Sequence, residues 1–216
     1  MLSKYKLVIF DWDGTLMDSV NRIVSCLSTS ADLCGLPKHG FDDLKQVIGL
    51  SLEKCFEHLY SEQSSDLFQQ WAEHYKAQFI THDMTPSTLY NGVMPVLSWL
   101  QQQNKQIAVA TGKSRNGLDR VLQESEMSHW FTTTRCADET RSKPDPLMLN
   151  EILSELNIEA HEAVMVGDTS HDMKLANNAG VDVIGITWGV HSAEILSQYR
   201  PVAVIDSIVE LQHLPL

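Results

Sequence analysis

Short apolar runs alternate along this chain with longer segments in which apolar residues recur at every third or fourth position. The first run, residues 7–10, contains no polar residue and leads directly into two aspartates, Asp11 and Asp13. Unbroken runs of this length are typical of strands buried on both faces, and the wider spacing is typical of amphipathic helices. Their alternation predicts an α/β fold with a doubly wound parallel, Rossmann-like sheet. Further strands are expected at 106–110, 131–136, 163–166, 183–186 and 202–205.

The segment after the first strand has only helical periodicity. Apolar residues from Leu16 to Leu27 fall at spacings of three and four, and Gly35 and Pro37 end that helix. No strand pattern returns for the next fifty residues, which predicts an all-helical domain inserted after the first strand. Its expected extent is 16–84, with 1–15 and 85–216 forming the α/β core. Further helices of the insert are expected at 41–47, 52–60 and 66–80.

Composition and charge limit the partners that the protein could bind. With 216 residues and 43% hydrophobic content, the chain can form one core and a smaller attached unit. Its 28 acidic and 16 basic residues give a formal charge of -12. Nucleic acids and anionic membranes bind concentrated positive charge, so neither is expected as a partner. A small anionic substrate stays compatible, because a bound metal ion can reverse the local field.

The cysteines indicate a reducing environment. Cys26, Cys34, Cys55 and Cys136 form neither a CxxC pair nor a His-rich cluster, which argues against a zinc site. In a chain of this length they are interpreted as reduced, partly buried thiols. No secretion signal is recognised, and no run approaches the roughly 20 apolar residues of a membrane span. We expect a cytoplasmic protein that is a monomer or a weak homo-oligomer.

Polar side chains follow directly after three of the predicted strands. Asp11 and Asp13 follow the first strand, and Thr111 follows the second. Asp168 follows the fourth, and Lys143 lies in a loop that could reach the same edge. Ligands of open parallel sheets bind beyond the carboxyl ends of the strands. Each residue alone could belong to an ordinary turn. Their joint occurrence at one sheet edge predicts a functional site.

The residue types at this edge suit phosphoryl transfer. Two close carboxylates repel unless a cation or a shared proton lies between them. Carboxylate and backbone oxygens suit Mg²⁺, and a metal ion, a lysine and a hydroxyl together neutralise a transferring phosphoryl group. One aspartate can be the nucleophile, forming an aspartyl phosphate, and a second carboxyl can move protons to the leaving oxygen and from water.

Four motifs span nearly the whole chain in a fixed order: Asp11-x-Asp13-Gly14-Thr15, Thr111, Lys143-Pro144 and Gly167-Asp168-x-x-x-Asp172. In this order and at these spacings they resemble the motifs of the haloacid dehalogenase superfamily. The helical insert resembles the small cap of that superfamily's phosphoglycolate phosphatase-like members. The resemblance implies a Mg²⁺-dependent phosphomonoester hydrolase that acts on a small phosphometabolite through an aspartyl-phosphate intermediate.

The resemblance also implies roles for the catalytic and metal-binding residues. Asp11 would be the nucleophile and a Mg²⁺ ligand, and Asp13 would be the general acid/base with its backbone carbonyl on the metal. Lys143 would neutralise phosphoryl charge and hold Asp11. Asp168 would bind the metal directly. Asp172 would either bind it through water or hold Lys143.

Four further positions would bind the substrate. Thr111 and the amide of Gly112 would hold the phosphoryl oxygens, and Gly14 would let the backbone approach them. Relatives often carry Asn where this chain has Gly112, so no side-chain contact is expected there. Gly49 lies in a segment, 47–51, that resembles the loop which closes over the site in relatives. An ordinary helix-helix turn is the alternative for that segment.

Three more polar residues stand near the motifs. Lys113 and Arg115 could reach a substrate anion, but cations at the start of a helix are more often solvated. His191 could assist the reaction, but a histidine on an exposed loop is more often neutral surface. The sequence favours the solvated interpretation for all three.

Several functions compete with the phosphatase. A sugar-phosphate mutase keeps every motif and differs in the cap. A carbon–halogen hydrolase has no leaving oxygen to protonate, and a phosphonate hydrolase uses an amine from the cap, so Asp13 argues against both. A non-catalytic binding protein predicts the loss of a motif residue, yet all are present. Phosphoglycolate, nucleoside monophosphates, sugar phosphates and pyrophosphate all stay compatible as substrates.

Overall fold

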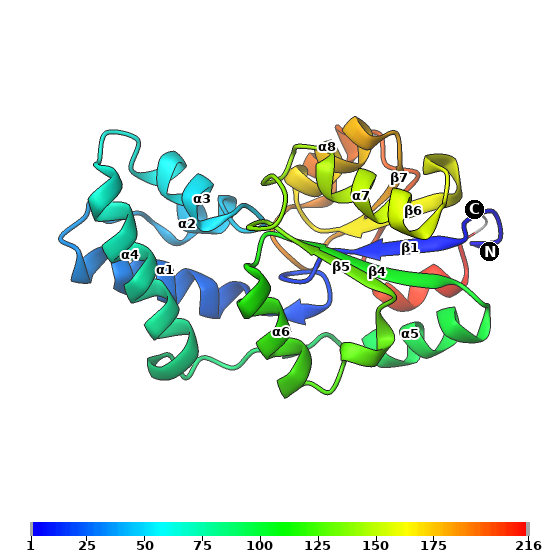
Figure 1. Cartoon of the computed structure of the whole chain (residues 1–216), viewed down its shortest axis with the longest axis horizontal. Coiled ribbons are helices and arrows are strands. Elements are labelled where there is room, and N and C mark those ends of the chain that lie inside the picture. Colours follow the sequence, from blue (N-terminus) through cyan, green and yellow to red (C-terminus); the bar gives the residue numbers. More distant parts are fainter. Residues whose placement is uncertain (1, 215–216) are drawn as a thin grey trace.

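The core of the protein is a six-stranded parallel sheet with the strand order β5-β4-β1-β6-β7-β8. A computed structural model describes residues 2–214, without the side chain of residue 65. Figure 1 shows the sheet with helices on both faces and the helical cap beyond one edge. This confirms the predicted fold class. The strands are β1 (Leu7–Phe10), β4 (Gln106–Thr111), β5 (Thr133–Cys136), β6 (Ala163–Gly167), β7 (Asp182–Ile186) and β8 (Ala203–Ile205).

The first strand lies at the centre of the sheet because all four of its residues are apolar. β1 pairs with β4 on one side and with β6 on the other. Phe10 is aligned with Val109 and Val166, so the three strands end at nearly the same level. The residues that follow them therefore meet at one edge.

Alternate side chains of β1 enter two separate hydrophobic clusters. Val8 and Phe10 belong to one cluster, and Leu7 and Ile9 belong to the other. Successive residues of a strand point to opposite faces, which explains why a strand without polar residues needs helices on both sides. On the first face lie α5 (Val93–Gln102), α6 (Arg115–Glu124) and η4 (Ile208–Gln212), and on the second α7 (Leu147–Leu156), α8 (Ser170–Ala179) and α9 (Ala193–Ser197).

The cap has a hydrophobic cluster of its own. Trp71 is fully buried in this cluster and packs against Phe56, Tyr60 and Tyr75 at ring-centroid distances of 5.4, 6.2 and 6.2 Å. Trp71, Tyr75 and Phe79 recur at four-residue intervals, and all three pack into this cluster, so their spacing is that of a core-facing helix side. The elements are α1 (Val20–Leu33), α2 (Phe41–Gln46), α3 (Leu52–Leu59), α4 (Ser65–Ala77) and a π-helical turn, η1 (Gln78–His82).

The chain enters and leaves the cap through a short two-stranded ribbon that the sequence does not predict. Strand β2 (Met17–Asp18) pairs antiparallel with β3 (Thr88–Leu89). The helix expected to begin after Thr15 therefore begins at Val20. Two residues carry no readable alternation, so a strand this short is defined only by its partner. The two chain crossings lie side by side. In residues 2–214 no helix has the length and apolar character needed to cross a membrane.

Candidate active site

Three buried carboxylates meet beyond the ends of β1 and β6. Asp11, Asp168 and Asp172 each offer a carboxylate oxygen, and these oxygens lie within 4.8 Å of one another. The first two follow their strands directly, and Asp172 lies in the first turn of α8. All three are almost inaccessible to solvent. Three buried anions this close need a compensating positive charge.

Lys143 supplies part of that charge. Its Nζ donates to Asp11 Oδ1 at 2.7 Å and to Asp172 Oδ1 at 2.6 Å, and its side chain is fully buried. Burial disfavours the ammonium, but the two carboxylates outweigh burial and hold the pKa of Lys143 above its ordinary value. Asp172 Oδ2 accepts from the N–H and hydroxyl of Thr169, at 3.0 and 2.6 Å, in the capping box of α8. Asp172 is therefore held at both oxygens.

Both carboxylate oxygens of Asp168 accept hydrogen bonds, whereas only one oxygen of Asp11 accepts one from the described residues. The hydroxyl of Thr15 donates to Asp168 Oδ1 at 2.7 Å, and the N–H of Val190 donates to Oδ2 at 2.8 Å. Burial, and then the charge of Asp172, raises the pKa of Asp168 to about 7. Burial also raises the pKa of Asp11, although Lys143 opposes the shift.

One oxygen at this site has no partner. Asp11 Oδ2 is buried, and no described residue donates a hydrogen bond to it. Such atoms are rare in native structures and call for an explanation such as an ion. Three carboxylates with one unpaired oxygen fit a hard divalent cation with oxygen ligands.

Two glycines make room for Asp168. A Cβ on Gly14, whose φ is +81°, would collide with the Asp168 carboxylate, and so would a Cβ on Gly189. Gly14 is predicted from the resemblance to let the backbone approach a phosphoryl group. The structure places it against the carboxylate. The role of Gly189 beside Asp168 was not predicted from the sequence. Its place just after β7, at the same sheet edge, could have identified it.

Asp13 lies apart from the three carboxylates. The hydroxyl of Ser19 donates to Asp13 Oδ1 at 2.6 Å, and Lys113 Nζ lies 3.1 Å from the same oxygen. Thr111 is fully buried, and its Oγ1 accepts from the N–H of Lys113 at 3.2 Å. Because that oxygen accepts here, the Thr111 hydroxyl proton stays available to a ligand.

A cavity of about 1560 Å³ separates the cap from the sheet edge, and Asp13, Lys143, Gly49 and Gly112 all line it. Gly112 lies directly under the cap loop. A Cβ at this position would lie 2.5 Å from the carbonyl oxygen of Gly49 and 2.6 Å from that of Leu50. The absence of a side chain at Gly112 thus lets the loop backbone seat against the segment that follows β4.

Two expectations about solvated residues are wrong. The Lys113 side chain is only 11% exposed, because it contacts Asp13 and the cap. His191 is 4% exposed. Its Nδ1 accepts from the N–H of Ser170 at 2.8 Å, so Nε2 carries the proton and donates to Gln46 Oε1 at 2.7 Å. Burial lowers the pKa of His191 to about 4. The residues around Lys113 and His191 in the sequence do not predict these contacts, because the partners are far apart in the chain.

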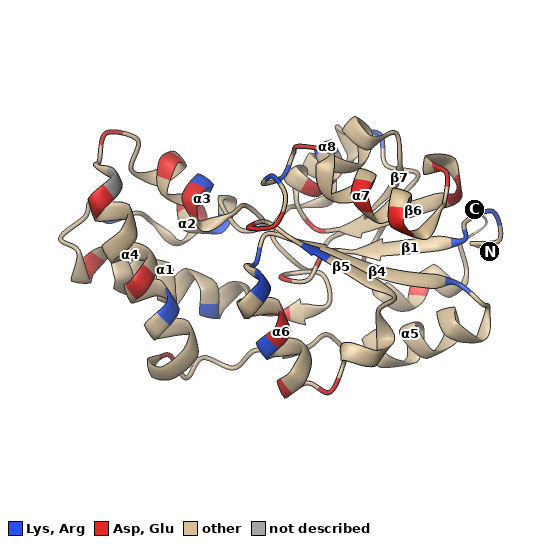
Figure 2. Ribbon diagram, in the orientation of Figure 1, with Lys and Arg blue, Asp and Glu red and all other residues tan. Residues whose placement is uncertain are grey.

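The third of these residues, Arg115, makes no ion pair with Asp11, Asp168 or Asp172 in the described structure and instead pairs with other acidic residues. Its guanidinium pairs with Glu139 at 2.7 Å and with Asp119 at 3.1 Å, and it donates to Thr134 Oγ1 at 2.8 Å. These contacts tie the start of α6 to β5 and to the segment after it. Figure 2 shows basic and acidic residues next to one another on α6.

The cap also makes direct polar contacts with the core. The side-chain and backbone oxygens of Gln46, at the end of α2, pair with two imidazoles of the core, those of His191 and His171. The N–H of Ser51 donates to Ser142 Oγ at 2.9 Å. These contacts and the close approach at Gly112 describe a cap that is seated on the site.

Comparison with known proteins gives the family. Residues 8–186 match the family described as haloacid dehalogenase-like hydrolase. The chain belongs to this family. This haloacid dehalogenase-like hydrolase is 32% identical over 211 residues to "Probable phosphatase IndB" of Dickeya dadantii (strain 3937), covering 95% of this chain and 91% of that protein. It is 28% identical over 220 residues to "Phosphoglycolate phosphatase" of Nitrosococcus oceani, covering 99% and 98%.

A solved structure agrees with this assignment. The structure described as "Putative haloacid dehalogenase-like hydrolase from Bacteroides fragilis" superposes with a TM-score of 0.89 at 26% identity, covering 96% of this chain and 99% of that one. The predicted membership is thus confirmed, including the likeness to phosphoglycolate phosphatases. The protein is a hydrolase with the helical cap expected for it.

Proposed function

We propose that the protein is a Mg²⁺-dependent phosphatase that hydrolyses phosphomonoesters through a phosphate ester of Asp11. The observation that carries the proposal is the state of the Asp11 carboxylate. Lys143 holds one of its oxygens, while the other is buried and receives no hydrogen bond from residues 2–214. A carboxylate fixed in this way is a prepared nucleophile. The phosphatases among the relatives support the same reaction class.

The metal would be held by Asp11 and Asp168 and by the backbone carbonyl of Asp13. Asp172 would bind it through water, or would instead hold Lys143, which donates to it at 2.6 Å. The close approach of the three carboxylates and the unpaired Asp11 oxygen fit such an ion. When bound, Mg²⁺ supplies positive charge that offsets the anionic carboxylates and the phosphoryl oxygens. Lys143 adds a second positive charge from the protein itself.

In the first step an Asp11 oxygen attacks phosphorus, and the bond from phosphorus to the ester oxygen breaks. The leaving oxygen takes the electron pair of that bond and a proton from the Asp13 carboxyl. The Thr111 hydroxyl and the Gly112 N–H donate to the phosphoryl oxygens as their charge changes. In the second step Asp13 accepts a proton from water, which attacks phosphorus. The bond between phosphorus and the Asp11 oxygen breaks, and phosphate is released.

The cap would control access to this site. We propose that residues 16–84 move as one unit about the ribbon formed by β2 and β3, while the catalytic residues stay on the core formed by 1–15 and 85–216. Cap closure would exclude bulk water and bring Gly49 and its neighbours to the substrate. The four free cysteines support a reducing, cytoplasmic location. The substrate would be a small phosphometabolite.

A phosphometabolite panel tests the proposal. Phosphoglycolate, nucleoside monophosphates, sugar phosphates and pyrophosphate are compared by kcat/KM with Mg²⁺, with EDTA, and with EDTA followed by excess Mg²⁺. We expect release of phosphate that stops in EDTA and returns with Mg²⁺. Ca²⁺ should restore little, because its looser coordination fits the site poorly. Full activity in EDTA would contradict the metal assignment. Slow hydrolysis with isomerised sugar phosphate as the main product would indicate a mutase.

A further inference from the structure

Lys113 is held by contacts with three segments of the core: the end of β4, the segment after β5 and the loop that carries Asp13. Its backbone N–H donates to Thr111 Oγ1, and its backbone carbonyl accepts from the N–H of Ala137 at 3.0 Å. Its ammonium lies 3.1 Å from Asp13 Oδ1, where the two side chains are 11% and 10% exposed. A lysine side chain costs conformational entropy to fix, so a fixed and nearly buried one calls for a reason.

The two oxygens of Asp13 are used unequally. Oδ1 accepts from the Ser19 hydroxyl at 2.6 Å and pairs with Lys113. No described residue donates to Oδ2, and Asp13 lines the cavity between cap and core. Holding one oxygen of a carboxyl from two sides fixes its rotation about the Cβ–Cγ bond. The free oxygen then has a single direction in which to exchange a proton.

We propose that Lys113 is a positioning residue which, with Ser19, holds Oδ1 of Asp13 so that Oδ2 exchanges the proton with the leaving oxygen and later with water. This inference rests on the proposed phosphatase reaction and adds a residue to it. Lys113 itself does not touch the reacting atoms in this account. Its effect is confined to steps in which Asp13 transfers a proton.

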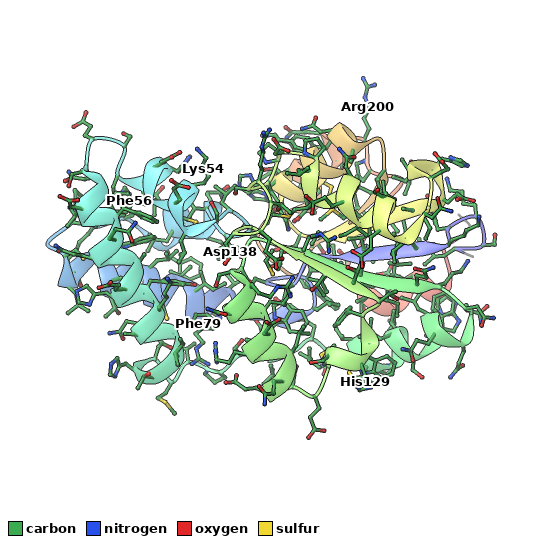
Figure 3. All side chains as sticks on the ribbon, in the orientation of Figure 1. Lys54, Phe56, Phe79, His129, Asp138 and Arg200 are labelled. Carbon is green, nitrogen blue, oxygen red and sulfur yellow. The ribbon has the colours of Figure 1, made fainter. Side chains whose placement is uncertain are left out.

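The cap completes this arrangement through Phe79. The Lys113 ammonium lies 4.6 Å from the centre of the Phe79 ring, and that ring belongs to the π-helical turn at the end of α4. Figure 3 shows Phe79 between the cap and α6. A cation over an aromatic face is attracted to it, and the ring also shields the cation from water. Turns of this kind recur at functional sites. With the cap seated, Phe79 therefore helps to hold Lys113 against Asp13.

Two arginines also lie over the Phe79 ring, and one of them offers a matched control for Lys113. Arg120, on α6, lies 5.5 Å from the ring centre, and Arg22, on α1, lies 4.9 Å from it. Arg120 pairs with Glu124, and among the described contacts no hydrogen bond or ion pair joins it to Asp13. Replacing Arg120 removes a cation from the same ring and the same cavity wall without touching the acid/base.

The test compares the leaving-group dependence of Lys113→Met, Lys113→Arg, Phe79→Leu and Arg120→Met with that of the wild type. For each protein, kcat/KM is measured with Mg²⁺ for an alkyl phosphate and for p-nitrophenyl phosphate, whose leaving group needs little protonation. General acid/base groups are worth about 10²–10⁴-fold in rate. We expect Lys113→Met to lower the value for the alkyl ester by about 10–100-fold, and for the aryl ester by less than about threefold.

The other variants separate positioning from simple support of the fold. Lys113→Arg should recover most of the alkyl activity, and Phe79→Leu should lower the alkyl value several-fold more than the aryl value. Arg120→Met should leave the alkyl-to-aryl ratio unchanged. Equal losses on both esters in Lys113→Met would overturn the inference and assign Lys113 to phosphate binding. An unchanged ratio in both Lys113→Met and Phe79→Leu would overturn it as well. The proposed function fails separately, if the wild type hydrolyses neither ester.

Discussion

Adding a single methyl group at Gly112 should weaken cap closure. The Cβ of alanine would lie 2.5 Å from the carbonyl oxygen of Gly49 and 2.6 Å from that of Leu50, whereas Cβ atoms essentially never approach within 3.0 Å. Both contacts are with backbone, so no side-chain rotation relieves them. The loop must move by roughly half an ångström, the difference between 3.0 and 2.5 Å. Overpacking of this kind costs about 1–3 kcal/mol.

This cost acts on the closed cap alone, because an open cap does not meet the new methyl group. A penalty of 1–3 kcal/mol lowers the ratio of closed to open cap by about 5–150-fold. If turnover requires closure, kcat/KM should fall by up to the same factor, while the melting temperature of the core stays close to that of the wild type. Gly112→Asn adds a larger side chain and should lower kcat/KM at least as much.

The assay is kcat/KM for p-nitrophenyl phosphate together with hydrogen exchange of the loop at 47–51. Gly117→Ala is the matched control, since it lies in α6 and its Cβ would meet only Ser114 Oγ at 3.2 Å and Lys113 Cβ at 4.0 Å. Faster exchange in the loop of Gly112→Ala, with normal exchange in Gly117→Ala, is expected. Wild-type efficiency and wild-type exchange in Gly112→Ala would refute the reasoning.

Three further predictions concern the site and the cap. Asp11→Asn should abolish turnover of every substrate, whereas Asp13→Asn should lose about 10²–10⁴-fold on alkyl phosphates and much less on aryl phosphates in the phosphorylation step; equal losses on both would contradict the assignment of Asp13. Gly49→Val should alter the ranking of phosphate esters while Mg²⁺ dependence persists, because Gly49 has a φ of +95° and its Cβ would lie 3.5 Å from the Thr169 hydroxyl oxygen; an unchanged ranking would favour an ordinary turn. Burial lowers the pKa of His191 from 6.5 to about 4, so neutral His191 contributes stability above about pH 6.5 that is lost as the pH falls through 4. The melting temperature should fall less between pH 7 and pH 5 in His191→Gln than in the wild type, and parallel curves would contradict this.

The core of the site was predictable because it depends on local pattern. Asp11, Thr111 and Asp168 stand directly after apolar runs, and a parallel sheet brings such positions to one edge whatever the remaining sequence. The structure places Asp11, Asp168 and Asp172 together and puts Lys143 between two of them. Their roles in catalysis and metal binding stay predictions, as do the boundaries of the cap domain.

The contacts between cap and core could not be predicted. Lys113 contacts Asp13, which is about one hundred residues away in sequence, and Phe79, which is about thirty residues away. No local sequence pattern predicts contacts between residues so far apart. For the same reason His191 is buried where a surface loop was expected. Gly112 is the instructive case. Its departure from the usual Asn was visible in the sequence, but its reason, the carbonyl oxygens above it, belongs to a distant segment.

The central claim is that Asp11 becomes phosphorylated, and chemical trapping tests this directly. The enzyme is mixed with p-nitrophenyl phosphate and Mg²⁺, quenched, and reduced with borohydride, which converts an aspartyl phosphate to homoserine. Peptide mass spectrometry should then find homoserine at position 11 in the wild type and at a higher level in Asp13→Asn, where hydrolysis of the intermediate is slowed. Asp11→Asn and the sample in EDTA should show none. Turnover without homoserine at position 11, or homoserine at another aspartate, would contradict the account.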